Sequence, residues 1–375
     1  MERLPNLFGL SREELAVTLA PLIDRSYTAG QIFHWLYARR VTEFGAMTDL
    51  PDSLRRLLAE RFRIAWPAIK EVGRSTDGSK KYLLNLEDGG EIEAVYIVYG
   101  SRITLCLSSQ IGCPLDCRFC LTGRMGLLRN LSAGEIAGQV AAITRDSAID
   151  IAQARIVFMG MGEPLNNYDA VLQAFRLLVD PKGFDIAPRR VTLSTAGLVP
   201  GIERLATENP RPRLAISLAS PDDAKRTELM PINRKYDLAR LMEACRRFPL
   251  GPREKITFEH VLIDRINDDP GDARKIARLL RGVRAKVNVI PYNEAGVEGF
   301  ATPASGRVAA FREALWVHGI PATVRWSKGR DIGAACGQLV RETGQAKVRR
   351  APPARSTRRG SSEPPRRGRG QSRSR

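Results

Sequence analysis

Hydrophobic positions recur every three to four residues over residues 1–66. Leu15 and Leu19 belong to one such run, and Ser11 stands three residues before Glu14, the spacing of an N-terminal capping box. This period is typical of amphipathic helices that bury one face. The sequence therefore predicts a small helical domain with Arg and Lys on its outer faces. It is either an ordinary solvated bundle or an RNA-binding accessory domain.

The hydrophobic period shortens to two over residues 67–98. Two alternating runs, 81–86 and 91–97, flank the turn-forming triplet at 88–90, and this combination predicts a β-hairpin. Glu93 stands inside the second run, where most carboxylates simply point to solvent. We expect the hairpin to connect the helical domain to the rest of the chain.

Strand-like and helix-like patterns alternate from residue 99 to residue 341. The expected strands are 102–108, 154–160, 189–195, 213–219, 256–263, 285–291 and 321–326. The expected helices are 132–145, 168–179, 198–208, 235–248, 270–282 and 304–318. Such alternation is typical of parallel strands joined by right-handed crossovers. The sequence therefore predicts an α/β fold, a partial (β/α)6 barrel of TIM type, whose active site would lie at the C-terminal ends of the strands.

Composition and charge indicate a folded protein that favours polyanions. The chain has 375 residues, 43% of them hydrophobic, and a net charge of +18. Residues 347–375 hold eleven Lys or Arg and a single acid, Glu363, a net +10 that leaves +8 on the remainder. A basic protein of this kind favours nucleic acid as a partner.

Residues 342–375 are rich in Pro, Gly, Ser and Arg and hold little that could build a core. The sequence predicts a basic disordered tail there, which either keeps the protein soluble or binds phosphates without specificity. The sequence has no run of about 18 apolar residues, so it predicts no transmembrane helix. The N-terminus shows no signal-peptide pattern, so we expect a cytoplasmic protein without membrane association.

Three cysteines stand close together directly after the first expected strand of the barrel. Cys113, Cys117 and Cys120 are separated by three and then two residues, so their thiolates can meet at one site from one short loop. Iron–sulfur clusters are held by cysteine thiolates, normally four. Three local thiolates would leave one iron with an open position, so the spacing points to a cluster that binds a further ligand.

A zinc site and a disulfide framework both fit the cysteine loop less well. A structural zinc site usually needs a fourth Cys or His at close spacing, and His34, His260 and His318 all lie outside this loop. A disulfide framework suits small secreted chains, and this chain is not small. The iron–sulfur interpretation is therefore favoured.

Small and polar residues follow several of the remaining expected strands. Gly162 and Glu163 follow the second strand, where glycine lets the backbone approach a ligand closely and the carboxylate can accept an amino group. Ser194, Ser217 and Asn293 lie at the ends of the third, fourth and sixth strands. These positions suit hydrogen bonds to the carboxylate or ribose of a ligand, although each residue could equally serve a turn.

The chain resembles the dual-specificity adenine-C2 RNA methyltransferases of the radical S-adenosylmethionine (SAM) superfamily over about residues 10–341. The loop that ends in Phe119-Cys120 is similar to the cysteine signature of the superfamily. Further matching stretches follow in the family's order: 31–35, 77–82, 93–97, 104–120, 129–131, 159–164, 231–233 and 334–339. Jointly these stretches are highly specific.

The resemblance implies two cofactors and the residues that hold them. A [4Fe-4S] cluster would be bound by Cys113, Cys117 and Cys120, with SAM at the open iron. The positions that match SAM contacts in the family are Gly162, Glu163, Ser194, Ser217, Leu218, Ala219 and Asn293. The family usually has His where this chain has Ala219, so only a backbone contact would survive there.

The resemblance also implies the chemistry of three further residues. Adenine C2 is electron-poor and cannot attack SAM directly. In the family a first SAM methylates a cysteine, matched here by Cys336, and a second SAM yields the radical that activates this methyl group for addition to C2. Cys106 matches the cysteine that releases the product through a transient disulfide with Cys336. Glu93 matches the family's proton acceptor, although Cys106 as a thiolate could also take the proton.

The function implied is methylation of adenine C2 in 23S rRNA and in tRNA. The expected partners are these RNAs and a one-electron donor such as flavodoxin or ferredoxin, and we expect a monomer. Two alternatives stay open. The related resistance enzymes that methylate adenine C8 share the same cysteines, whereas a non-catalytic iron–sulfur RNA-binding protein would not need both Cys106 and Cys336.

Overall fold

The computed structural model describes residues 3–339, which form a helical N-terminal region and an α/β core. Within these residues, one ten-stranded sheet accounts for most of the β-structure and a two-stranded sheet for the rest. The basic tail predicted over 342–375 lies outside the described residues.

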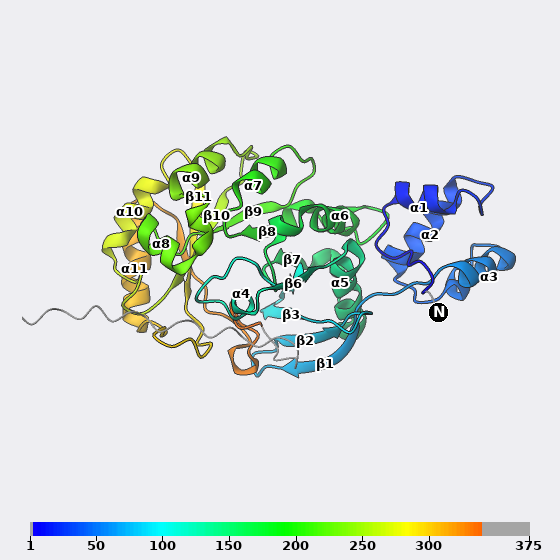
Figure 1. The fold of residues 1–375 in the computed structure, drawn as a ribbon, viewed down its shortest axis with the longest axis horizontal. Coiled ribbons are helices and arrows are strands. Elements are labelled where there is room, and N and C mark those ends of the chain that lie inside the picture. Colours follow the sequence, from blue (N-terminus) through cyan, green and yellow to red (C-terminus); the bar gives the residue numbers. More distant parts are fainter. Residues whose placement is uncertain (1–2, 340–375) are drawn as a thin grey trace, which may run out of the picture.

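The N-terminal region is helical, as its period of three to four predicts. It contains α1 (Arg12–Leu19), α2 (Tyr27–His34) and α3 (Asp52–Arg61), with a π-helical turn at Trp35–Arg39 and a 3-10 turn at Phe44–Ala46. Both hydrogen bonds of the capping box at Ser11 are present. The three helices form a lobe at one end of the molecule, beyond α5 (Ala133–Ser147) and α6 (Tyr168–Val179) (Figure 1).

The ten-stranded sheet has an antiparallel part and a parallel part. Its order is β1-β2-β3-β4-β7-β8-β9-β10-β11-β12. The antiparallel strands are β1 (Ala68–Arg74), β2 (Lys80–Asn85) and β3 (Glu91–Tyr99), which pairs with β4 (Arg102–Leu107). The parallel strands after β4 are β7 (Arg155–Phe158), β8 (Val191–Thr195), β9 (Arg213–Ser217), β10 (Ile256–Leu262), β11 (Ala285–Pro291) and β12 (Ala322–Val324).

Helices connect each pair of successive parallel strands. Besides α5 and α6 they are α7 (Val199–Leu205), α8 (Asp223–Leu229), α9 (Leu238–Arg247), α10 (Gly271–Leu279) and α11 (Ser305–Val317). The 3-10 turns are Ile151–Gln153, Pro164–Asn167, Pro188–Arg190, Pro231–Arg234 and Arg330–Ile332. Because β1 and β12 are the two edges of this sheet, the barrel is open. The predicted partial (β/α)6 barrel is therefore confirmed.

Every expected strand and helix of the barrel is present, but several elements were not expected. These are β1, the small antiparallel pair β5 (Gln110–Gly112) and β6 (Leu127–Asn130), the short helix α4 (Leu121–Met125), and α8. Strand β1 is mostly exposed, so it lacks the alternation that reveals a half-buried strand. The hairpin of β2 and β3 is part of the main sheet, because β3 pairs with β4.

Residues 325–339, here called the closing segment, run from the end of β12 to the antiparallel strands. Asp331 accepts hydrogen bonds from the Ser75 hydroxyl at 2.6 Å and from the Thr76 backbone N–H at 3.1 Å. The Gly329 backbone N–H donates to Asp77 Oδ2 at 2.8 Å. The segment thus joins the two edges of the open sheet, which strand pairing leaves apart.

One cluster of buried apolar side chains runs through the whole described chain. It includes Leu15 of α1, Ile136 of α5, Phe258 of β10 and Phe311 of α11, all fully buried. Burial of apolar surface is the main favourable term in folding, so the N-terminal helices share the stability of the core. None of the helices in residues 3–339 is long and apolar enough to cross a membrane.

Candidate active site

One cavity lies at the C-terminal ends of the parallel strands, where barrels of this class place their active sites. The predicted site residues that line it are Cys113, Cys117, Cys120, Gly162, Glu163, Ser194, Ser217, Asn293 and Cys336. Residues far apart in sequence therefore meet here. Leu218 and Ala219, which were expected to contact SAM, are not part of the lining.

The cysteine loop connects β5 to α4 and is held by backbone hydrogen bonds from three directions. The Cys113 N–H donates to Gly126 O at 2.9 Å, and the Arg118 N–H donates to Leu229 O at 3.0 Å. The Leu121 N–H donates to Gly337 O at 2.9 Å, which ties the loop to the closing segment. Burial is the main reason that the pKa of each of the three loop thiols is raised.

The arrangement of the loop thiols suits a cluster better than a single ion. Within residues 3–339, no three His, Cys, Asp or Glu side chains are placed to hold one metal ion. Cys117 and Cys120 are nonetheless close enough that the charge of each disfavours a thiolate on the other. In a [4Fe-4S] cluster each cysteine binds a different iron, so its ligands need not meet at one point. The donor set therefore fits an iron–sulfur cluster.

Gly160 and Gly162 follow β7, and contacts within the protein leave no room for a side chain at either position. A Cβ on Gly160 would lie 2.7 Å from Ser108 Oγ, and one on Gly162 would lie 2.6 Å from Gln110 Cβ. Gly162 also has a φ of +102°, which residues with a side chain rarely adopt. Close approach of this turn to the β4–β5 connection therefore explains both glycines, whereas the sequence had suggested close approach to a ligand.

Glu163 is buried and bonded to neighbouring backbone. Its carboxylate accepts hydrogen bonds from the Ala196 N–H at 2.8 Å and the Leu165 N–H at 3.1 Å. Burial raises the pKa of Glu163 to about 7, and these hydrogen bonds oppose the rise. The Thr195 side chain also bonds to this carboxylate. Because a carboxylate has about four acceptor positions, capacity is left for a ligand amino group in the cavity.

The remaining strand-end residues separate into two groups. Asn293 lines the cavity and donates to Ser327 Oγ at 2.9 Å and to Cys336 O at 3.1 Å, so it also holds the closing segment. Ala219 is buried with a φ of +55°, and its carbonyl accepts a bond from Asn267 at 2.7 Å. Leu218 is fully buried. Contacts of Leu218 and Ala219 with SAM stay predictions.

Cys336 faces the same cavity as the cysteine loop, and Cys106 lies beside it. Cys106 is buried on β4, whereas Cys336 is exposed toward the cavity, and both thiols are free. Burial raises the pKa of Cys106 to about 12, with a smaller contribution from the neighbouring Cys336. Arg325 of the closing segment opposes the rise for both thiols. The structure therefore brings the two predicted reactive cysteines together.

Glu93 lies on β3, and the structure gives it a cation as a partner. Its Oε1 is 2.9 Å from Lys81 Nζ on β2, and the Glu93 side chain is only 4% exposed. The same Lys81 ammonium is 3.5 Å from the carbonyl oxygen of Gly333 in the closing segment. Glu93 is therefore buried, and does not point to solvent as most carboxylates in such strands do.

Sequence reasoning missed two charged residues that line the cavity and one charged residue behind it. Glu259 and Arg325 line the cavity, and the Glu259 carboxylate accepts a bond from Asn288 at 3.0 Å. Arg226 is fully buried and donates to Ala196 O at 2.7 Å and to Ser217 O at 3.2 Å. The only signal in the sequence was a charged residue inside an apolar run, such as Glu259 in the run that forms β10.

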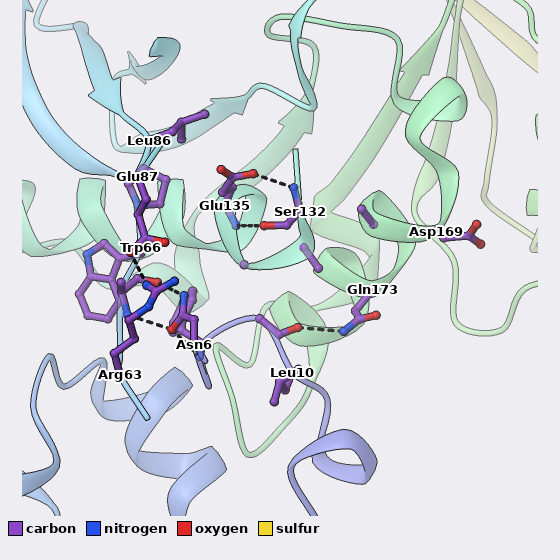
Figure 2. A pocket seen from close by; sticks show the side chains of 17 residues that line it. Asn6, Leu10, Arg63, Trp66, Leu86, Glu87, Ser132, Glu135, Asp169 and Gln173 are labelled. Carbon is purple, nitrogen blue, oxygen red and sulfur yellow. Dashed lines mark hydrogen bonds and ion pairs between the residues drawn. The ribbon is translucent and has the colours of Figure 1, made fainter. Parts of the chain in front are cut away.

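A larger hollow of about 610 Å³ lies where the N-terminal region meets the core, as Figure 2 shows. None of the predicted site residues lines it. Its polar side chains bond to their surroundings: Gln173 donates to Gly9 O at 2.8 Å, and Asn6 donates to Ala65 O at 2.8 Å. Arg63 pairs with Glu87. We therefore interpret this hollow as the seam between two packed regions.

Comparison with known proteins gives consistent matches along the chain. The profile of the radical SAM superfamily matches residues 107–277, and that of the ribosomal RNA large subunit methyltransferase N-terminal domain matches residues 5–64. A dual-specificity RNA methyltransferase RlmN of Syntrophotalea carbinolica is 45% identical over 362 residues, 96% of this chain and 95% of the relative. The RlmN protein of Geobacter sulfurreducens is 45% identical, over 90% of this chain and 93% of its own.

A solved structure agrees with these matches. The crystal structure of a radical SAM methyltransferase from Sphaerobacter thermophilus superimposes with a TM-score of 0.84 at 44% sequence identity. The superposition covers 89% of this chain and 99% of that protein. The similarity therefore includes the N-terminal region as well as the barrel.

Proposed function

The chain belongs to the RlmN family of radical SAM RNA methyltransferases, and we propose that it methylates C2 of adenine in 23S rRNA and in tRNA. The proposal rests above all on one observation. Cys336 is exposed toward the cavity that the cysteine loop lines, with the Cys106 thiol beside it. A non-catalytic iron–sulfur protein would have no need for this pair of thiols.

The family uses a [4Fe-4S] cluster and SAM, and the residues of this cavity fit both groups. Cys113, Cys117 and Cys120 would hold the cluster, and Glu163 would bind the amino group of SAM. When bound, the two cofactors supply the methyl group and the radical chemistry that adenine C2 requires. Ser194, Ser217 and Asn293 would bind the remaining polar groups of SAM, since these three line the same cavity.

Cys336 would carry the methyl group to the base. Its position suits this role because the closing segment brings it next to the cysteine loop, where the Gly337 carbonyl accepts the Leu121 N–H. After the carbon has been added to adenine, Cys106 would form a disulfide with Cys336. In this step the Cys106 thiol loses its proton and the bond between the Cys336 sulfur and the transferred carbon breaks. That carbon keeps the electron pair and takes up a proton to become the methyl group, so the RNA is released.

Glu93 would take the proton from C2. A proton acceptor must be deprotonated at neutral pH, and burial raises the pKa of Cys106 to about 12, which keeps that thiol protonated. Glu93 Oε1, in contrast, lies 2.9 Å from the ammonium group of Lys81. These environments favour Glu93 over Cys106 as the acceptor. We further expect a monomer that takes electrons from a flavodoxin or ferredoxin.

Mass spectrometry of RNA nucleosides tests the proposal. Full-length protein with reconstituted cluster is incubated without oxygen with 23S rRNA fragments or tRNA, SAM and a reductant. We expect 2-methyladenosine from the wild type and none from the Cys336→Ala variant. Finding 8-methyladenosine instead would assign the protein to the resistance-type enzymes, and finding no methylated nucleoside with a fully loaded cluster would refute the methyltransferase assignment.

A further inference from the structure

A basic residue stands at the start of each of six parallel strands. Arg102, Arg155 and Arg213 are the first residues of β4, β7 and β9, and Lys286 is the second residue of β11. Arg190 and Lys255 directly precede β8 and β10. We call these six residues the basal ring, because they lie at the N-terminal end of the barrel, opposite to the cavity.

The members of the basal ring share one face of the sheet. Side chains two positions apart on a strand point to the same side. A residue four positions after a ring residue therefore lies on the same face of its strand. On β7, β8, β9, β10 and β11 these residues are Met159, Ser194, Ser217, Glu259 and Ile290, and all five line the cavity. On β4 the corresponding residue is Cys106, next to Cys336. The ring therefore belongs to the inner face of the barrel, at the end away from the cysteine loop.

The basal ring has little counter-charge of its own. In the described part of the chain, none of its six side chains forms an ion pair, whereas many basic residues elsewhere do. The Arg190 guanidinium donates to the backbone carbonyl and to the side-chain oxygen of Gln153. Five of the six residues are exposed and Arg190 is partly exposed. The acid nearest along these inner faces is Glu259, at the cavity end.

The charges of the ring repel one another. Burial and the charges of Arg102, Arg190 and Arg213 lower the pKa of Arg155. Burial also lowers the pKa of Lys286, and Arg213 and Arg155 add to this effect, although Glu259 opposes it. Gathering like charges destabilises a compact state. An arrangement that is unfavourable in the free protein becomes favourable when an anion binds across it.

We propose that the basal ring binds backbone phosphates of the RNA substrate. The inference rests on the proposed function, since it assumes that RNA is the substrate, and it adds a second contact surface to the catalytic cavity. Four of the six residues are Arg, whose planar guanidinium matches phosphate geometry with two parallel hydrogen bonds. Phosphate contacts of this kind position a nucleic acid without reading its sequence.

An acidic protein such as an electron donor fits the ring less well. Five of the six ring residues stand four positions before a residue that lines the cavity, which corresponds to roughly 13 Å at about 3.3 Å per residue. A donor docked on the ring would be held at that distance from the cysteine loop. An RNA longer than this span can place one adenine in the cavity and still reach the ring with its backbone.

Salt-dependent RNA binding tests the proposal. The full-length triple variant Arg102→Gln, Arg155→Gln, Arg213→Gln is compared with a matched variant that loses three exposed charges outside the basal ring, on α10 and directly after it, Arg274→Gln, Arg278→Gln, Arg281→Gln. Each lost phosphate contact reduces the slope of log K against log salt by about 0.7–0.9. We expect the slope of the ring variant to fall by about 2 and its RNA affinity at 0.15 M salt to fall at least about tenfold. The outside variant should change far less.

Further readouts separate this inference from its alternatives. The ring variant should keep its iron content and unfold at the same or a higher temperature, because repulsion between the ring charges has been removed. Its kcat should be retained while its KM for RNA rises.

If wild type methylates RNA and the ring variant keeps the wild-type slope, the inference is wrong and the proposed function stands. Loss of stabilisation by tripolyphosphate without a change in RNA slope would assign the ring to a free polyphosphate. Slower reduction by flavodoxin with an unchanged RNA slope would assign it to an acidic protein. Either result would overturn the RNA assignment.

Discussion

Lys81 Nζ lies 2.9 Å from Glu93 Oε1, across two neighbouring antiparallel strands. The Lys81 side chain is 22% exposed and that of Glu93 is 4% exposed, so this pair is shielded from water. Lys81 also reaches the Gly333 carbonyl, three residues before Cys336. One ammonium group thus contacts both the proposed proton acceptor and the segment that carries the proposed methyl carrier.

Replacing Lys81 should destabilise the protein. Removing one partner of a buried ion pair leaves the remaining charge uncompensated, which typically costs about 3–5 kcal/mol. We therefore expect Lys81→Met to lower the free energy of unfolding by about this amount in urea titrations, and Lys81→Arg to restore part of it. The control is Lys70→Met, which removes the partly exposed pair with Glu91 and should cost about 0–1 kcal/mol. Equal losses in Lys81→Met and Lys70→Met would contradict a special role for Lys81.

Replacing the two reactive cysteines should give different products. Cys336→Ala removes the methyl carrier, so we expect neither methylated RNA nor a covalent adduct. Cys106→Ala leaves methyl loading and addition to the base intact, so RNA should stay attached through Cys336 and survive denaturing electrophoresis. Cys245→Ala, which removes a buried thiol outside the cavity, is the matched control and should turn over normally. A Cys106→Ala protein that releases its product would sink the disulfide step.

Replacing a loop cysteine should remove the cluster. Anaerobically purified protein should be brown and contain about four irons per chain if the cluster is [4Fe-4S]. We expect Cys117→Ala to lose most of this iron and the visible absorbance, with Cys245→Ala unchanged. Full iron content in Cys117→Ala, or zinc in the wild type, would argue against the ligand assignment.

Arg226 lies behind the cavity, yet replacing it should weaken SAM binding. The buried guanidinium bonds to the carbonyls of Ala196, Ser217 and Leu218 and to Asn233 Oδ1, and the Ala196 N–H in turn bonds to Glu163. Lysine cannot reproduce this planar set of donors, and each unsatisfied buried carbonyl costs about 1–3 kcal/mol. We expect Arg226→Lys to be destabilised by a few kcal/mol and to bind SAM at least about tenfold more weakly in calorimetry. Wild-type affinity would show that Arg226 has no positioning role.

His260 should make stability depend on pH below neutrality. The imidazole is fully buried, stacks on Phe311, and has its pKa lowered to about 4 by burial. The unfolded chain, with a pKa near 6.5, binds the proton more readily, so stability is lost as pH falls from 6.5 toward 4, by about 3 kcal/mol.

Urea titrations between pH 5 and pH 7 provide the measurement for His260. The slope of stability against pH should flatten in His260→Gln. His318→Gln, which alters an exposed imidazole, should leave the wild-type slope unchanged. A wild-type slope in His260→Gln would mean that different groups cause the pH dependence.

Local patterns in the sequence were sufficient for the elements of the barrel and for the cysteine loop. The parallel strands are short runs of apolar residues, and the helices between them have a clear period of three to four, so each is recognisable without its neighbours. Cys113, Cys117 and Cys120 lie on one loop, so their proximity follows from chain length alone. The elements that were not recognised are β1, whose side chains are mostly exposed, and the short elements β5, β6, α4 and α8.

Tertiary structure alone decided which distant groups meet. Cys106 and Cys336 are close because the closing segment joins the two edges of an open sheet, and Lys81 faces Glu93 because of the register of β2 and β3. Leu218 and Ala219 directly follow Ser217 in the sequence, yet both are buried and only Ser217 of the three is part of the cavity lining. Such relationships depend on packing and on hydrogen bonds between segments far apart in sequence. A local pattern carries no information about them, because hydrophobic periodicity records only which face of an element is buried and not what it is buried against.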